Sequence, residues 1–119
     1  MSCKGSCDNA ILMAEDEIVD IMPQYPLWKL IDDDKKISRK FVAKNFKSSV
    51  SFFISLSLVA EEEGHHPDFH LTGYRNVEVV LSTHSIGGLS ILDFVLASKL
   101  DKIKVDYSPS WIRGQVGII

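Results

Sequence analysis

The stretch Glu61-Glu62-Glu63-Gly64-His65-His66-Pro67 marks the abrupt end of an apolar helix, and paired imidazoles follow at once. Its three carboxylates fall in the last helical turn, where the helix dipole disfavours negative charge. Gly64 stands where helices commonly end in a left-handed residue. Pro67 then directs His66 into an extended conformation. A fold does not need acids at a helix C-terminus beside two histidines, so this stretch indicates a chemical role.

The residues before this stretch predict a long helix over 46–63, which Asn45 caps. The helix carries two apolar stripes: Val50, Phe53, Ile54 and Leu58 form the first, and Phe52, Leu56 and Val59 form the second. So wide an apolar surface predicts burial on a sheet, and against a partner helix as well.

Alternation of apolar and polar residues predicts strands, and the turn residues between them predict two strand pairs. We expect strands at 28–31, 37–43, 69–74 and 77–83, and helices at 11–22, at 46–63 and after the capping box of Ser90 and Asp93. The order α-β-β-α-β-β-α predicts an α+β fold, a four-stranded antiparallel sheet with helices packed on one face. The other sheet face is left open and could hold a pocket.

The turn between the last two strands decides which residues meet. A two-residue turn at Arg75-Asn76 would set Pro67 opposite His84. Opposite residues of a strand pair have Cβ atoms about 4.5–5.5 Å apart, so His66 and His84 would then be near neighbours. A longer loop that includes Gly73 would shift this register by one or two residues.

The composition argues for a single globular domain and against several functional classes. The 119 residues are 45% hydrophobic and carry a net charge of -3, which gives no electrostatic footprint for nucleic acid. No apolar run approaches the ~20 residues of a membrane span. Residues 1–10, without a leader pattern, are expected to be a flexible N-terminus, 11–104 the domain, and 105–119 an extension whose apolar side chains pack on the domain or on a neighbouring subunit. A cytoplasmic location is the expectation.

Three separated blocks resemble the pterin-4a-carbinolamine dehydratase family in order and spacing. They are Glu61-x3-His65-His66-Pro67, Leu81-Ser82-Thr83-His84-Ser85 and Gly88-Leu89-Ser90-x-x-Asp93-Phe94. The early Pro26-x-Trp28 is also similar to the family, and the resemblance runs from about residue 13 to about residue 104. The segment from Pro67 to Tyr74 is one residue longer than in the family's shorter form, and the tail after Lys104 is not part of the pattern.

The resemblance implies dehydration of a 4a-hydroxytetrahydropterin to the quinonoid dihydropterin, in tetrahydrobiopterin recycling, with no metal or redox cofactor. It implies that His65, His66 and His84 are the working imidazoles. The pterin site would also include Pro67, Ser82, Thr83 and Ser85. The family further implies a homodimer or homotetramer and, as an alternative function, a dimerisation cofactor of a homeodomain transcription factor, with a nuclear as well as a cytoplasmic location.

The residues themselves agree with acid–base chemistry, since an unperturbed imidazole has a pKa of about 6.5 and can give or take a proton near neutral pH. Glu61 lies one helical turn before His65, so we expect it to accept the N–H of that imidazole and to share in catalysis. Asp93 is expected to be a helix cap first, with support of the site as its second role, and Trp28 to form core or pocket wall. His70 is expected to have no catalytic role.

Two other classes of function remain open from the sequence. His65, His66, His84 and Asp93 could form a metal site, although adjacent histidines in an extended chain point to opposite faces and rarely bind one ion. The chain could also act only as an interaction protein. Cys3 and Cys7 are too few for a disulfide framework or for a zinc site of their own.

Overall fold

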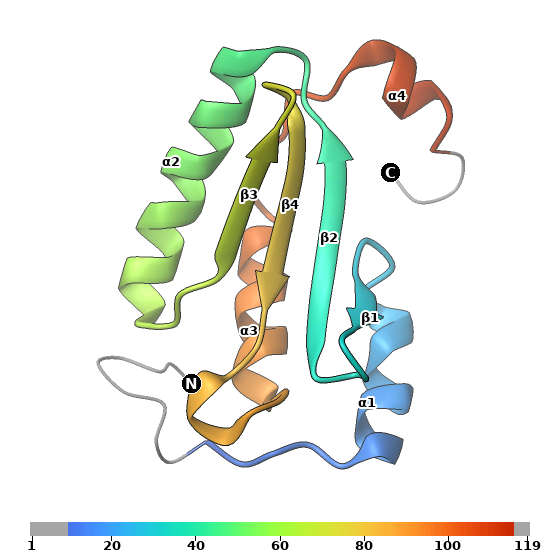
Figure 1. The fold of residues 1–119 in the computed structure, drawn as a ribbon, viewed down its shortest axis with the longest axis vertical. Coiled ribbons are helices and arrows are strands. Elements are labelled where there is room, and N and C mark those ends of the chain that lie inside the picture. The colour runs from blue at the N-terminus through green and yellow to red at the C-terminus, as the bar shows by residue number, and fades with distance from the viewer. Residues whose placement is uncertain (1–9, 116–119) are drawn as a thin grey trace.

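A four-stranded antiparallel sheet with helices on one of its faces forms the body of the protein (Figure 1). The computed structural model describes residues 10–115. The strands are β1 (Lys29–Ile31), β2 (Lys36–Val42), β3 (Asp68–Thr72) and β4 (Asn76–Leu81), in the spatial order β1-β2-β4-β3. The helices are α1 (Glu15–Ile21), α2 (Phe46–Glu63), α3 (Ile91–Leu100) and α4 (Pro109–Arg113), with 3₁₀ turns η1 (Met22–Gln24) and η2 (His84–Ile86). The predicted α+β class is confirmed.

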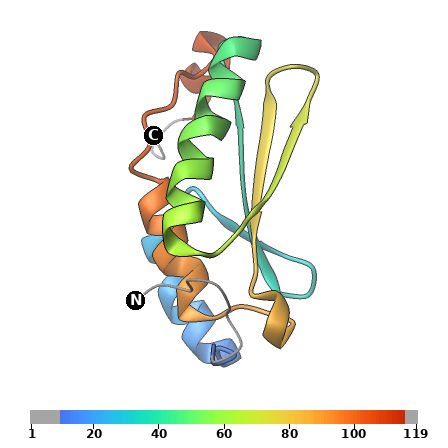
Figure 2. The same cartoon turned by 90° about the vertical axis from the view of Figure 1, so that its left-hand side faces the viewer.

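The two faces of the sheet differ because side chains alternate along each strand. On one face, the side chains of β2 and β4 enter the core with α2 and α3, which Figure 2 shows on the same side of the sheet. Ile37 opposes Leu81 and Phe41 opposes Val77 on this face, and all four are buried. The other face carries the polar Lys40, His70 and Glu78, none of them buried, although Ser38 and Val80 on the same face are buried.

Helix α2 has the predicted bounds, and the signals at both of its ends work as expected. The side chain of Asn45 accepts a hydrogen bond from the amide of Ser48 at 2.9 Å, and Gly64 adopts a φ of 64° after the last turn. The two apolar stripes differ in burial. Phe52 and Leu56 of the second stripe are buried on the sheet, whereas the first stripe is largely exposed.

The β3–β4 hairpin corrects the predicted turn. Its loop is Gly73–Arg75, so Thr72 pairs with Asn76, whereas a two-residue turn at Arg75-Asn76 would give Thr72 the partner Val79. Gly73 and Tyr74 both adopt positive φ angles, 54° and 58°, and two left-handed residues in succession reverse the chain earlier than predicted. The predicted pairing of Pro67 with His84 is therefore wrong.

The chain after α3 returns to the sheet and ends in α4, a helix that the aperiodic sequence did not predict. Pro109 is its first residue and Ser108 its cap, the two signals that start this short helix. Trp111 stacks on Tyr107 with ring centroids 5.5 Å apart, and both pack against the core, as predicted for this apolar extension. Val116, Ile118 and Ile119, together with residues 1–9, lie outside the described residues.

A buried guanidinium ties the extension to the sheet. Arg39, 3% exposed, donates from Nη1 to Asp101 at 3.0 Å and from Nη2 to the hydroxyl of Tyr107 at 2.8 Å. The indole of Trp28 also donates to Asp101, at 3.0 Å. Burial raises the pKa of the Asp101 carboxyl above its ordinary value, and the Trp28 hydrogen bond and the Arg39 charge oppose part of that increase.

Replacing Arg39 by Met is expected to lower the free energy of unfolding by about 1–3 kcal/mol, because it leaves Asp101 without its cation in a partly buried setting. Urea unfolding followed by circular dichroism measures the change. Lys40→Met is the matched control on the exposed face of the same strand, and it should change stability by no more than about 0.5 kcal/mol. Equal effects of the two substitutions would contradict a specific role for the buried cluster.

Candidate active site

One buried carboxylate joins the two loops that carry the predicted catalytic histidines. Asp93, 0% exposed, lies in the first turn of α3. Its Oδ1 lies 2.6 Å from Nε2 of His65, in the loop after α2. Its Oδ2 accepts hydrogen bonds from the hydroxyl of Thr83 at 2.8 Å, in the segment after β4, and from the amide of Ser90 at 3.0 Å. The predicted capping box is confirmed, and the same side chain also contacts His65.

His65 is directed inward by the end of the helix. Gly64 reverses the backbone in the left-handed conformation, and the imidazole that follows is 5% exposed. Residues four apart face each other only while the helix continues, and Gly64 ends the helix before His65. Nε2 of His65 contacts Asp93, 28 residues further along the chain, a partner that the sequence did not predict.

Glu61 pairs with His66. Its Oε1 lies 3.3 Å from Nε2 of His66, and the two side chains are 78% and 62% exposed. An exposed pair of this kind contributes little to stability, since the median for such pairs is about 0–1 kcal/mol. Its position in solvent makes both groups accessible to a ligand.

His84 opens the 3₁₀ turn η2 and is exposed. Thr83, directly before it, is fully buried, and its amide donates to the carbonyl of Gly88 at 2.8 Å. Because Thr83 and His65 bind the two oxygens of one carboxylate, the backbone of His84 is held beside the His65 loop. The two histidine loops are therefore connected through Asp93, and not through the strand pairing that the sequence predicted.

The other predicted site residues are buried to different extents. Pro67 and Ser82 are half-buried and Ser85 is exposed, so these three can border a ligand. Trp28 is buried in the core and bonds to Asp101, eight residues after Asp93 and therefore about 12 Å along the helix direction. The structure does not join Trp28 to the histidines.

Two supporting residues were missed from the sequence. The hydroxyl of Ser90 lies 2.8 Å from that of Thr83 and extends the network around Asp93. Glu63, one of the three carboxylates in the last turn of α2, is buried and pairs with Lys99 of α3. A signal for Glu63 exists, since it follows Phe52, Leu56 and Ala60 on the buried stripe of α2.

Within residues 10–115, no group of three or more His, Cys, Asp or Glu side chains is arranged to hold a metal ion. The burial of His65 and the exposure of His66 and His84 place the three imidazoles in different surroundings. Over the same described range, no helix is long and apolar enough to cross a membrane.

Comparison with known proteins identifies relatives over most of the chain. The family model for pterin 4 alpha carbinolamine dehydratase matches residues 12–103. The mitochondrial pterin-4-alpha-carbinolamine dehydratase 2 of Arabidopsis thaliana is 38% identical over 96 residues, which are 79% of this chain and 51% of that protein. This chain thus spans about half the length of the plant relative.

Bacterial relatives match over nearly their whole length. A Nitrosococcus oceani protein assigned to the same dehydratase is 37% identical over 105 residues, 87% of this chain and 92% of that protein. The crystal structure of a transcriptional coactivator/pterin dehydratase from Brucella melitensis has a TM-score of 0.70 and 31% identity, covering 76% of this chain and 96% of that one. The chain belongs to the pterin 4 alpha carbinolamine dehydratase family and is an enzyme of the dehydratase class.

Proposed function

We propose that this protein dehydrates a 4a-hydroxytetrahydropterin to the quinonoid dihydropterin by histidine general acid–base catalysis. The bond from C4a to the hydroxyl oxygen breaks, the ring nitrogen next to C4a loses its proton, and water leaves. One group must give a proton to the hydroxyl and another must take the proton from nitrogen. Imidazoles can do both near neutral pH. The observation that carries the proposal is the Asp93 carboxylate, which binds His65 and the residue before His84 together.

Two of the three predicted catalytic histidines are exposed to a substrate in solution. His84 and His66 are exposed, and Pro67, Ser82 and Ser85 border them. We assign proton transfer to His84 together with His65, and the gripping of the pterin chiefly to His66. Glu61, paired with His66 at 3.3 Å, would hold that imidazole in place.

His65 is buried, and its Nε2 lies 2.6 Å from Oδ1 of Asp93. In the proposed mechanism Nε2 carries the proton and donates it to Oδ1, while Oδ2 accepts from an amide and a hydroxyl. Protonation of His65 can then change only at Nδ1. In this proposal the Asp93 carboxylate orients the imidazole of His65, as the acid of a catalytic triad orients its histidine.

The direct test is an assay in which a 4a-hydroxypterin is generated in situ and its disappearance is followed with and without the protein. The proposal requires a faster, saturable disappearance in the presence of the protein. Loss of the substrate at the same rate in both reactions would reject it. Pterins that differ in the C6 side chain, run in parallel, would identify the preferred substrate and test the assignment to tetrahydrobiopterin recycling.

A role as dimerisation cofactor of a transcription factor is the alternative that the resemblance raises. We favour catalysis, because the histidines are retained and two of their loops are joined by Asp93. A pull-down with catalytically inactive protein would test the alternative. The predicted cytoplasmic or nuclear location stays a prediction, which fluorescence microscopy of the tagged full chain would test.

Self-association is part of the proposal, because α2 presents an apolar stripe to solvent. Phe46, Ile54 and Leu58 are 56%, 55% and 68% exposed, and Phe53 is 43% exposed. The sheet also ends in two edge strands, β1 and β3, whose outer backbone groups can pair with another chain. A second copy of this chain would cover the stripe of α2 with its own identical stripe.

Light scattering of the wild-type protein at micromolar concentration should therefore give a homodimer or homotetramer. The double substitution Ile54→Ser, Leu58→Ser removes apolar surface from the stripe and should shift the protein to a smaller species. Both side chains are exposed, so the core should be unaffected. Ile91→Ser, which changes a 42% exposed side chain on α3, is the matched control and should leave the mass unchanged. A monomeric wild-type protein would contradict self-association.

A further inference from the structure

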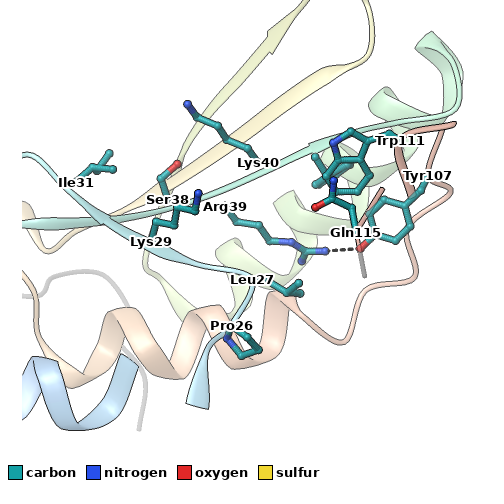
Figure 3. Close-up of a pocket in the computed structure, with 11 residues that line it drawn as sticks. Pro26, Leu27, Lys29, Ile31, Ser38, Arg39, Lys40, Tyr107, Trp111 and Gln115 are labelled. Carbon is teal, nitrogen blue, oxygen red and sulfur yellow. Dashed lines mark hydrogen bonds between the residues drawn. The ribbon is translucent and has the colours of Figure 1, made fainter. Parts of the chain in front are cut away.

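A cavity of about 330 Å³ lies between β1, β2 and the segment that carries α4, away from the histidines (Figure 3). Its lining, taken from the described residues, includes none of His65, His66, His84 and Asp93. Strand β1 pairs with β2 only over Lys36–Ser38, and the amide of Ser108 rejoins the strand at the carbonyl of Val42, so residues 39–41 between them border the cavity. A volume of this size falls at the lower end of the roughly 300–1,000 Å³ of small-molecule sites.

Aromatic rings form one wall of the cavity. Tyr107 packs edge-on against the buried Phe41 with centroids 5.5 Å apart, and Trp111 stacks on Tyr107 at 5.5 Å with an angle of 25° between the rings. The hydroxyl of Tyr107 is held by Arg39, which fixes the position of the wall. Tyr107 and Trp111 lie after residue 103, so this wall comes from the part of the chain that the family match does not include.

Positively charged side chains border the side of the cavity opposite the aromatic wall. Lys29 and Lys40 lie on the same face of the sheet, because Lys29 opposes Ser38 and Lys40 is two residues further along β2. In Figure 3 both lysines lie across the cavity from Trp111 and Tyr107. No carboxylate is among the described lining residues, although Arg39, the third cation there, is paired with Asp101.

Lys29 and Lys40 are both exposed, and neither makes an ion pair within residues 10–115. The nearest acid across the strands is Glu78, the direct partner of Lys40, and its carboxylate accepts a hydrogen bond from Ser38 at 2.7 Å. The cavity therefore offers a flat aromatic wall opposite two unpaired positive charges.

We propose that this cavity is a second binding site, separate from the histidine site, for a small planar aromatic molecule that carries one anionic group. The ring stacks against Trp111, and the anion lies between the ammonium groups of Lys29 and Lys40. Stacking needs a flat ring and the lysines need a negative charge, so the site discriminates against molecules that lack either feature. This site does not depend on the proposed reaction.

The test uses the full chain labelled with ¹⁵N and titrated with 2-naphthoate, while the indole N–H resonances of Trp28 and Trp111 are followed. A saturable shift of the Trp111 resonance is expected, with the backbone amides of residues 83–85 unshifted. Neutral 2-naphthamide and non-aromatic cyclohexanecarboxylate should each bind more weakly. Equal affinity for the naphthamide, no saturable shift at Trp111, or a saturable shift at residues 83–85 alone would each overturn the proposal.

Variants locate the two contacts. Lys29→Gln and Lys40→Gln should each weaken 2-naphthoate binding by about two- to fivefold, the range expected for one exposed ion pair. Trp111→Leu, followed at the Phe41 amide, should weaken it by about two- to tenfold, since an aliphatic side chain keeps the packing but not the aromatic face. Lys47→Gln, an exposed lysine on α2, is the matched control and should bind normally. The lysine variants should keep wild-type dehydratase turnover, so failure here is distinguishable from failure of the proposed reaction.

Discussion

The His84→Ala protein is expected to fold normally and to lose about 10²–10⁴-fold in kcat, the usual contribution of a positioned general acid or base. The fold should tolerate the change because the side chain of His84 is exposed and starts a short 3₁₀ turn. Pre-steady-state or steady-state turnover with a 4a-hydroxypterin generated in situ measures the loss. Urea unfolding checks that stability has not changed.

His70→Ala is the internal control for this experiment. His70 is exposed on β3 and opposes Glu78 on the open sheet face, away from the Asp93 network. Its replacement by alanine should leave activity near normal. A folded His84→Ala protein that turns over at the wild-type rate would refute the assignment of His84.

The remaining histidines should show different kinetic signatures. His65→Ala should also lose at least about two orders of magnitude in kcat. The double His65→Ala, His84→Ala protein should lose much less than the product of the two single effects, because residues that act as a unit are not additive. His66→Ala should change KM more than kcat, since we assign that residue to substrate binding.

Local signals predicted the frame of the fold well. The Asn45 cap and the left-handed Gly64 bound α2 where expected, and the Ser90 capping box starts α3. Each of these signals depends on hydrogen bonds between residues a few positions apart, so the sequence contains the whole interaction. The resemblance of three separated blocks predicted the family, which is confirmed, while the catalytic role of the histidines stays a prediction.

Contacts between residues far apart in the sequence were harder to predict. Glu61 satisfies the helical spacing to His65, yet it pairs with the exposed His66. The carboxylate that binds His65 comes from Asp93, and that contact depends on how α3 packs against the loop after α2. No local spacing encodes such a contact. For the hairpin, the two-residue turn at Arg75-Asn76 was wrong, and the alternative of a longer loop that includes Gly73 is what the structure shows, since Thr72 pairs with Asn76.

Asp93→Asn is expected to give a folded but strongly impaired enzyme, because it keeps the shape of the side chain and reverses one hydrogen bond. Oδ2 accepts from both Thr83 and Ser90, so the amide oxygen of Asn must take that position. The amide NH₂ then faces Nε2 of His65, which was 2.6 Å from Oδ1. Two donors cannot share this contact, so the His65 proton has to move from Nε2 to Nδ1.

This change of tautomer should lower kcat by about 10²–10⁴-fold, the contribution of a correctly poised acid–base group. Stability should fall by about 1–3 kcal/mol, the cost of one mismatched buried polar contact. ¹⁵N chemical shifts of the His65 ring report the tautomer directly.

The control for Asp93→Asn is the same substitution at Asp106, an exposed residue that accepts a hydrogen bond from Ser48 at 3.1 Å. It should leave activity and the His65 tautomer unchanged. If Asp93 only caps α3, its Asn variant should lose stability and keep the wild-type tautomer and kcat, because Asn also caps helices well. If Asp93 orients His65 for catalysis, the tautomer and kcat should change together in a protein that remains folded at the assay temperature.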